Sequence, residues 1–356
     1  MKALYVTSLH TSSGKTALCL GLARRMQAEG RKVGYFKPLS VQAWTPGKFQ
    51  TDEDADFVRR ILDLSEDVRD LVGVMLAPDT VKHLVATEPN TALLDQVKAS
   101  FGKVSQGKDV MLLEGGGSLR EGYCVGLGTP VVAEALGAPA LAIAPYRNRL
   151  SLLDDCLVAQ LRLGKQLLGV VVNQLPDEET AFFDEVARPY LKRHGIPLLG
   201  VLPNRERLEA ISVEELADAL QAEYLTLPEK RDVLIENMIV GAMGVQHALP
   251  HLRHVAGSKA VITGGDRADI QLVALETGSC CLVLTGHLRP VPEVLRRAEE
   301  SEVPILLVRQ NTLETVQLVE QVFGKTRLGQ AAKLQEFESL LEGHFDFARL
   351  YEALGL

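Results

Sequence analysis

Short apolar runs alternate with longer amphipathic segments from the start of the chain to about residue 221. A continuous apolar run indicates a strand buried on both faces, and apolar positions three and four apart indicate a helix. We therefore predict strands at residues 3–7, 33–37, 110–114, 140–144, 168–173 and 198–202, and helices at about 15–29, 54–64, 91–105, 152–163 and 180–194. This alternation is typical of an α/β fold with a doubly wound parallel sheet.

A second, smaller α/β unit is predicted in the rest of the chain. A helix at 213–221 is expected to close the first unit, and the following stretch contains Pro228 and charged residues without periodicity. We expect domains at 1–223 and 231–356, joined by a linker at 224–230. Strands are predicted at 233–240, 259–263, 280–285 and 304–308, and helices at about 291–300, 313–323 and 331–341.

Charge and cysteine content narrow the functional classes. The 356 residues carry a formal net charge of −8, which argues against a general electrostatic grip on nucleic acid or on an anionic membrane. The five cysteines have no C-x-x-C spacing, so neither a zinc site nor a disulfide framework is suggested. With no signal-peptide layout and no long apolar run, a cytoplasmic protein that contacts neither membrane nor nucleic acid is expected.

The segment between the first strand and the first helix has the pattern of a phosphate-binding loop, or P-loop. Residues 8–16 end in Gly14-Lys15-Thr16, and backbone N–H groups of such a loop surround phosphates while the lysine neutralises them. Leu9 replaces the first glycine of the usual pattern, so a helix start that binds nothing remains an alternative. The residues predicted to contact the nucleotide here are Thr11, Ser12, Ser13, Gly14, Lys15 and Thr16.

Three further segments carry residues suited to phosphate and Mg²⁺. Lys37 ends the second strand, at the edge where open α/β sheets bind ligands. Glu114 ends a buried strand and is followed by Gly115 and Gly116, the arrangement of a carboxylate Mg²⁺ ligand beside a phosphate-approaching loop. Asp54 lies in an acidic cluster at a helix start and offers a hard oxygen ligand. For the lysine a solvated strand end, and for the acidic cluster helix stabilisation, remain alternatives.

Together these residues resemble the dethiobiotin synthetase and cobyrinic acid diamide synthetase group of ATP-dependent enzymes, over about residues 1–221. The family's loop, Gly-Thr-Asp-Thr-x-x-Gly-Lys-Thr, aligns with residues 8–16 without a gap. The resemblance implies that ATP and Mg²⁺ are the cofactors, that Lys15 and Lys37 are catalytic, and that Thr16, Asp54 and Glu114 bind the metal. It also implies an adenine site at Asn173 and Pro203.

The second half contains a glycine-rich turn after a predicted strand. Gly264, Gly265, Asp266 and Arg267 form a possible second ligand site, because adjacent glycines and an arginine can make an anion-binding turn. A tight strand-to-helix connection, with Asp266 as the N-cap and Arg267 paired to Asp269, is an equally good interpretation.

This half resembles the DRTGG domain that follows the P-loop domain in long bacterial phosphotransacetylases. The similar pieces include residues 241–243, 262–270, 281–286, 304–308 and 323–327. The acetyltransferase domain of those enzymes would follow residue 356, so acetyl transfer is not expected of this chain.

Two functional hypotheses follow from the resemblance. The first is a regulatory ATP-binding protein or slow ATPase, and the second is an ATP-dependent ligase that activates a carboxylate or carbamate. Whether the chain is an enzyme stays open between them, as does a purely structural role with a degenerate site. A homo-oligomer is expected, because relatives of the first half place their sites near subunit interfaces.

Overall fold

The computed structural model describes residues 1–42, 44, 50–76, 78–86, 91–323 and 331–356. The chain divides into two compact units, the first made of Met1–Asn204 with Leu328–Leu356 and the second of Arg205–Arg327. None of the helices in the described ranges has the length and apolar character that a bilayer crossing needs.

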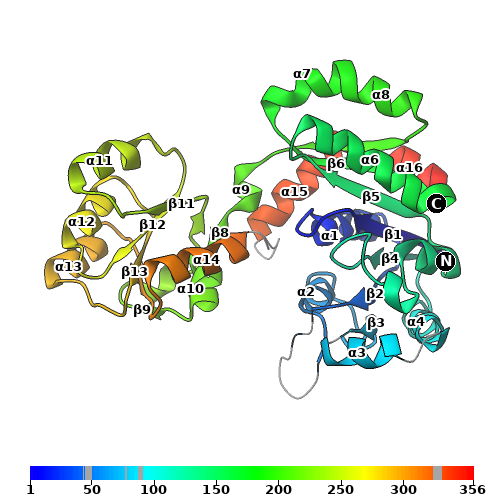
Figure 1. Ribbon diagram of the computed structural model, residues 1–356, viewed down its shortest axis with the longest axis horizontal. Coiled ribbons are helices and arrows are strands. Elements are labelled where there is room, and N and C mark those ends of the chain that lie inside the picture. The colour runs from blue at the N-terminus through cyan, green and yellow to red at the C-terminus, as the bar shows by residue number, and fades with distance from the viewer. Residues whose placement is uncertain (43, 45–49, 77, 87–90, 324–330) are drawn as a thin grey trace. The chain divides into compact units, whose positions relative to one another are not determined.

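The first unit contains a seven-stranded parallel sheet in the order β3-β2-β4-β1-β5-β6-β7 (Figure 1). Its central strands are buried at every position from Val110 to Glu114 and from Ala140 to Pro145, because helices cover both faces. This confirms the predicted doubly wound parallel sheet. The strands are β1 (Lys2–Ser8), β2 (Val33–Ser40), β3 (Val72–Met75), β4 (Val110–Glu114), β5 (Ala140–Pro145), β6 (Leu167–Leu175) and β7 (Leu198–Pro203).

The helices of the first unit begin where local capping supports them. Asp52 accepts a hydrogen bond from the backbone N–H of Ala55 at the start of α2, and Asn148 accepts one from Ser151 at the start of α6. The α-helices are α1 (Lys15–Ala28), α2 (Glu53–Ile61), α3 (Pro78–Ala86), α4 (Thr91–Val104), α5 (Thr129–Ala135), α6 (Arg149–Leu163), α7 (Thr180–Phe182), α8 (Arg188–Arg193), α15 (Ala331–His344) and α16 (Phe347–Leu354), and a π-helical turn covers Phe183–Ala187. Strand β3 and helices α3, α5 and α16 were not predicted from the sequence.

The second unit has a five-stranded sheet in the order β11-β12-β13-β14-β9, in which only β9 is antiparallel. The strand predicted at 233–240 is instead two strands, β10 and β11, since β10 pairs with β8 in a separate ribbon. The strands are β8 (Ile211–Ser212), β9 (Glu223–Tyr224), β10 (Leu234–Ile235), β11 (Asn237–Val240), β12 (Lys259–Gly264), β13 (Cys281–Thr285) and β14 (Ile305–Leu307).

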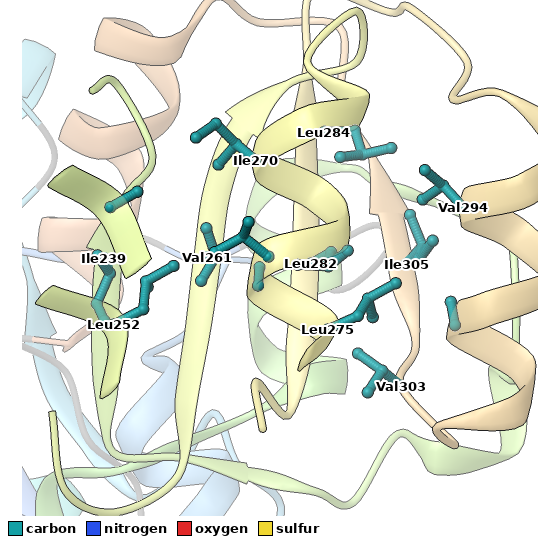
Figure 2. Packing of buried hydrophobic residues seen from close by; sticks show 14 of the residues in the cluster. Ile239, Leu252, Val261, Ile270, Leu275, Leu282, Leu284, Val294, Val303 and Ile305 are labelled. Atoms are coloured by element: carbon teal, nitrogen blue, oxygen red, sulfur yellow. The ribbon is translucent and has the colours of Figure 1, made fainter. Parts of the chain in front are cut away.

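Helices pack on this second sheet over two separate apolar clusters. The first cluster is built from α11, α12 and α13 with the sheet, and the second from α10 and α14 with the sheet. Val261, Leu282 and Leu284 of the strands meet Ile270 and Val294 of the helices in the first cluster (Figure 2). The helices are α9 (Glu206–Glu209), α10 (Val213–Leu220), α11 (Val245–His254), α12 (Ala268–Glu276), α13 (Pro292–Glu300) and α14 (Thr312–Phe323).

The division of the chain differs from the predicted domains at both boundaries. Helix α10, expected to close the first unit, packs against α14 of the second, and β9 joins the second sheet where a linker was expected to begin at 224. At the C-terminal end, the expected range 231–356 is wrong, because α15 and α16 pack on the first unit. An amphipathic helix shows in sequence that it has an apolar face, but not which surface covers that face.

The returning helices are held by specific contacts within the first unit. Glu338 and Glu342 of α15 pair with Arg24 and Arg25 of α1. A Cβ atom at Gly21 would lie 2.3 Å from Cδ1 of Leu341, so α1 and α15 approach each other closely at that glycine. The second unit is therefore inserted into the sequence of the first.

Candidate functional site

The predicted phosphate loop connects β1 to α1 at the carboxyl edge of the first sheet. Gly14 is the N-cap of α1 and has φ +89°, a left-handed conformation that glycine adopts without strain. Asn173, which lies in β6, donates a 3.1 Å hydrogen bond from Nδ2 to the carbonyl of Ser13. A Cβ atom at Gly14 would lie 2.7 Å from the same Nδ2 atom. The loop is thus fixed to the neighbouring part of the sheet at its tightest point.

Lys15 is buried although it carries a positive charge. Its ammonium donates to three neutral oxygens, Oγ of Ser8 at 3.0 Å, the carbonyl of Gly117 at 2.9 Å and the carbonyl of His10 at 3.4 Å. Within the described part of the chain it forms no ion pair with a carboxylate. Burial is the main cause that lowers the pKa of Lys15. A buried ammonium with only neutral acceptors suits an incoming anion.

Thr16 and Glu114 meet beside this lysine. The Thr16 hydroxyl donates to Oε1 of Glu114 at 2.7 Å, and the Tyr35 hydroxyl donates to Oε2 at 2.8 Å. Burial raises the pKa of Glu114, the charge of Lys37 opposes that rise, and the Asp54 carboxylate adds to it. A hydroxyl and a buried carboxylate in contact offer two hard oxygens of the kind that Mg²⁺ prefers.

Lys37 is held by two carboxylates rather than exposed at the strand end. Its ammonium lies 2.9 Å from an oxygen of Asp52 and 2.9 Å from Oδ2 of Asp54. Burial by itself disfavours the Lys37 charge, but Glu114, Asp54 and Asp52 outweigh it and raise the pKa of the lysine. The alternative of a solvated lysine is therefore wrong.

Asp52 is a site residue that the sequence did not single out. It is buried, caps α2 through Ala55, accepts from Ser40 and pairs with Lys37. In the sequence it was one of four acidic residues at a helix start, and only the fold distinguishes the residue that points inward. Glu121 was also missed: its Oε2 accepts a 2.7 Å hydrogen bond from the backbone N–H of Gly117 and so fixes the glycine-rich loop.

Gly115 and Gly116 follow β4 where the predicted loop should be. A Cβ atom at Gly115 would lie 3.1 Å from the Tyr5 ring, and one at Gly116 would lie 2.2 Å from Oε2 of Glu121. Side chains larger than hydrogen would therefore force these neighbours to move. This loop passes close to β1 because its residues are glycines.

The residues predicted around the base lie on adjacent strands. Asn173 is in β6 and Pro203 ends β7, and the pairing register places Leu175 opposite Pro203. The Asn173 amide also accepts from the backbone N–H of Gln174, at 3.0 Å. Each end of the Asn173 side-chain amide thus has one partner, the Ser13 carbonyl for Nδ2 and the Gln174 N–H for Oδ1, and each end keeps capacity for a second hydrogen bond.

The remaining predicted loop residues differ in their surroundings. Thr11 is exposed and Ser12 has φ +52°. The buried Ser13 hydroxyl has no hydrogen-bond partner among the described residues. An unpartnered buried hydroxyl beside Gly14 fits a site that a ligand completes. No group of three His, Cys, Asp or Glu side chains in the described ranges could hold a metal by itself.

The possible second site in the other unit has a structural explanation. Arg267 pairs with Asp269 at 3.0 Å and donates to the carbonyl of Met243 at 3.2 Å. Gly265 is required, because a Cβ atom there would lie 1.7 Å from the Leu288 carbonyl oxygen. These contacts favour the tight connection between β12 and α12. Arg267, not Asp266, occupies the N-cap position of α12. Residues 324–327, part of the DRTGG resemblance, lie outside the described residues.

Comparison with known proteins identifies the components of the chain. The family model described as AAA domain matches residues 2–212, and the model described as DRTGG domain matches residues 215–322. Phosphate acetyltransferase of Nitratidesulfovibrio vulgaris is 27% identical over 98% of this chain and 51% of its own length. The chain thus spans about half the length of that relative.

Two further matches are shorter. The ATP-dependent dethiobiotin synthetase BioD of Caldicellulosiruptor saccharolyticus is 31% identical over 33% of this chain and 49% of its own length. A solved structure of the CBS and DRTGG domains of a Clostridium perfringens pyrophosphatase, complexed with the activator diadenosine tetraphosphate, is 18% identical. The match covers 43% of this chain and 74% of the solved chain, with a TM-score of 0.30. The resemblance to dethiobiotin synthetases and to phosphotransacetylases is confirmed by the sequence matches.

Proposed function

The chain belongs to the AAA domain family, whose model matches residues 2–212, and on this premise we propose that its first unit binds ATP with Mg²⁺ and acts as a nucleotide-dependent regulator or slow ATPase. The second unit, which the DRTGG model matches, would respond to the state of the nucleotide site. A homo-oligomer and a cytoplasmic location belong to the same proposal.

The surroundings of the Lys15 ammonium are the main support for the proposal. It is buried and directed at three neutral oxygens, an arrangement that leaves its charge without a counter-ion in the described part of the chain. Burial is the main cause that lowers the pKa of Lys15, so the surroundings disfavour the charge. A phosphate placed against Lys15 would remove that penalty, and the N-terminus of α1 would favour the same anion.

The other site residues have roles that follow from their positions. Gly14 allows the loop backbone to approach phosphate oxygens, and Lys15 balances their charge. Thr16 and Glu114 would hold Mg²⁺, with Asp54 nearby as a further carboxylate. When bound, Mg²⁺ would supply charge neutralisation to the phosphates. Asn173 keeps the loop in place through Ser13. On the resemblance, Asn173 and Pro203 would also contact the base.

The state of Lys37 favours a regulator over a ligase. A ligase that activates a carboxylate needs a second cation free to bind the substrate or the transferred phosphate. Here that cation is paired with Asp52 and Asp54 and buried. An arriving substrate would have to displace two carboxylates, so rapid group transfer is not supported. The ATP-dependent ligase stays as the alternative, to be recognised by fast turnover with a carboxylate substrate.

Isothermal titration calorimetry with ATP and Mg²⁺ tests the proposal. Wild type should bind, Lys15→Ala should lose binding, and Lys165→Ala should bind normally because Lys165 is an exposed lysine of the same unit. A phosphate-release assay without added substrate should then show slow turnover in wild type. Absence of binding in wild type would overturn the proposal, and rapid release would replace the regulator by an ATPase.

A further inference from the structure

Three side chains that the proposed function does not use gather beside the phosphate loop. His10 lies in that loop, Arg147 follows β5, and Asp155 lies in α6. Strand β5 is the neighbour of β1 in the sheet, with Ser8 opposite Ile143. The loop after β1 and the loop after β5 therefore leave the sheet at the same edge.

The backbone on both sides of Arg147 is fixed close to the loop. The preceding residue, Tyr146, donates a 2.8 Å backbone hydrogen bond to the carbonyl of Asn173, and Asn173 itself donates to the Ser13 carbonyl. The following residue, Asn148, caps α6 through Ser151. The main chain beside Arg147 is thus connected to the P-loop through Asn173, while the Arg147 side chain is half exposed.

The three side chains converge on one ring nitrogen. Nε2 of His10 lies 3.0 and 2.9 Å from the two carboxylate oxygens of Asp155 and 2.7 Å from Nη2 of Arg147. Nη2 also lies 3.4 Å from Oδ2 of Asp155. The His10 carbonyl, for its part, accepts from the Lys15 ammonium.

A single imidazole nitrogen cannot satisfy both partners. If Nε2 carries a hydrogen, it can donate to Asp155, but it then faces an arginine nitrogen that can only donate. If Nε2 carries a lone pair, it can accept from Arg147, but the lone pair then faces a carboxylate that can only accept. In either state one of the two contacts is repulsive. The three side chains therefore cannot all be favourably paired at the same time.

Arg147 is the side chain of the three that can move away from the cluster. The Asp155 side chain is 9% exposed and fixed on a helix, whereas the Arg147 side chain is 49% exposed on a long, flexible stem. With Arg147 gone, Nε2 carries its hydrogen and donates to Asp155 without conflict. The guanidinium is then free to bind another anion at the same edge of the sheet.

We propose that Arg147 is a ligand of the terminal phosphate of the bound nucleotide, held by His10 and Asp155 until the nucleotide arrives. This inference rests on the proposed nucleotide site and adds to it a residue that distinguishes a triphosphate from a diphosphate. The planar guanidinium can make two parallel hydrogen bonds to phosphate oxygens. Its partners in the structure are the shared Nε2 of His10 and a carboxylate oxygen of Asp155 at 3.4 Å, which a phosphate would replace.

The chemistry selects a triphosphate over a diphosphate. On this proposal the N-terminus of α1 and Lys15 serve the phosphates that both nucleotides share, and Arg147 would contact the terminal group from the loop after β5. Loss of Arg147 therefore weakens ATP binding more than ADP binding. One charge-assisted bidentate contact corresponds to about a tenfold or greater difference in Kd.

Calorimetric titration of ATP and of ADP, each with Mg²⁺, tests the inference on the whole chain. Arg147→Ala should raise the Kd for ATP about tenfold or more and the Kd for ADP less than about twofold. Arg147→Lys, which keeps the charge but not the two parallel bonds, should fall between. Arg149→Ala is the matched control, since Arg149 is a nearby exposed arginine paired with Glu179.

The outcomes separate this inference from the function on which it rests. Wild type that binds ATP, combined with equal effects of Arg147→Ala on ATP and ADP or with none, overturns the role of Arg147 alone. Wild type that binds neither nucleotide overturns the proposed function and this role with it. Thermal unfolding of Arg147→Ala without nucleotide should match wild type, and a large loss there would show that the residue is structural.

Discussion

The Thr16 hydroxyl donates a 2.7 Å hydrogen bond to Oε1 of Glu114, across 98 positions of sequence. The two residues meet because β1 and β4 are parallel neighbours, with Val6 opposite Glu114, so the loop after β1 begins beside the end of β4. Tyr35 at the adjacent strand β2 completes the contacts of the carboxylate. Three strands thus build the oxygen pair that would hold Mg²⁺.

Glu114 gives a pH-dependent prediction. Burial raises the pKa of Glu114, so its ionisation destabilises the folded state, and that cost is absent at low pH and grows as pH rises through the folded pKa. Glu114→Gln removes the cost. The free energy of unfolding of the variant, relative to wild type, should therefore increase as the pH rises from the ordinary Glu pKa of 4.5 through the raised pKa of the folded protein, measured by urea titrations. A difference that stays constant with pH would contradict this account.

The pair of Lys37 and Asp52 should stabilise the first unit. Asp52→Asn keeps the N-cap oxygen of α2 but leaves a buried ammonium with one carboxylate less, at a cost of about 3 kcal/mol in the free energy of unfolding. Chemical denaturation measures the loss. Asp67→Asn is the control, because the Asp67–Arg69 pair is exposed and should contribute nothing measurable. An equal, small effect of both substitutions would show that the buried pair is not stabilising.

The same pair has an expected pH limit. The carboxylates raise the pKa of Lys37 above its ordinary 10.5 despite burial. The stabilisation is therefore fully present below pH 10.5 and is lost as the pH rises through the folded pKa. Wild type should lose more stability than Asp52→Asn on titration from neutral to strongly alkaline pH, followed by circular dichroism. Parallel curves would refute the assignment.

Two glycines with similar backbone angles should respond differently to alanine. Gly14 has φ +89° and a Cβ atom would lie 2.7 Å from Nδ2 of Asn173, whereas Gly30 has φ +85° and open space around it. Gly30→Ala should cost about 1 kcal/mol for the left-handed conformation alone. Gly14→Ala should cost more, about 2–3 kcal/mol, because Asn173 must also give up the Ser13 contact. Thermal unfolding compares the two variants. Equal losses of stability would mean that the Asn173 side chain moves aside without cost.

The returning helix α15 should stabilise the first unit. Leu341 is buried against α1 at Gly21, so Leu341→Ala should lower the free energy of unfolding by about 2–4 kcal/mol. Amide hydrogen exchange should show faster exchange in α1 and unchanged exchange in β12. Leu161→Ala is the control, since Leu161 is 81% exposed on α6. Normal protection of α1 in Leu341→Ala would argue against a stabilising role for α15.

Much of the candidate site was predictable because its chemistry is local in sequence. Gly14, Lys15 and Thr16 are consecutive, and a strand before them with a helix after them identifies the loop. Glu114 was recognised from a buried strand that ends in a carboxylate before glycines. Asp52, Glu121 and Arg147 could not be recognised, because each acts through a partner brought to it by the sheet.

The sequence by itself determined the alternation of strands and helices, the parallel first sheet and the phosphate loop, since burial on two faces and helical spacing leave a periodic record in the chain. Only the tertiary structure decided that α15 returns to the first unit, that Lys37 is neutralised by two carboxylates, and that His10 lies between Asp155 and Arg147. The physical reason is the same in each case. Periodicity shows that a side chain will be buried or charged, but the partner that covers or neutralises it is chosen by which strands become neighbours.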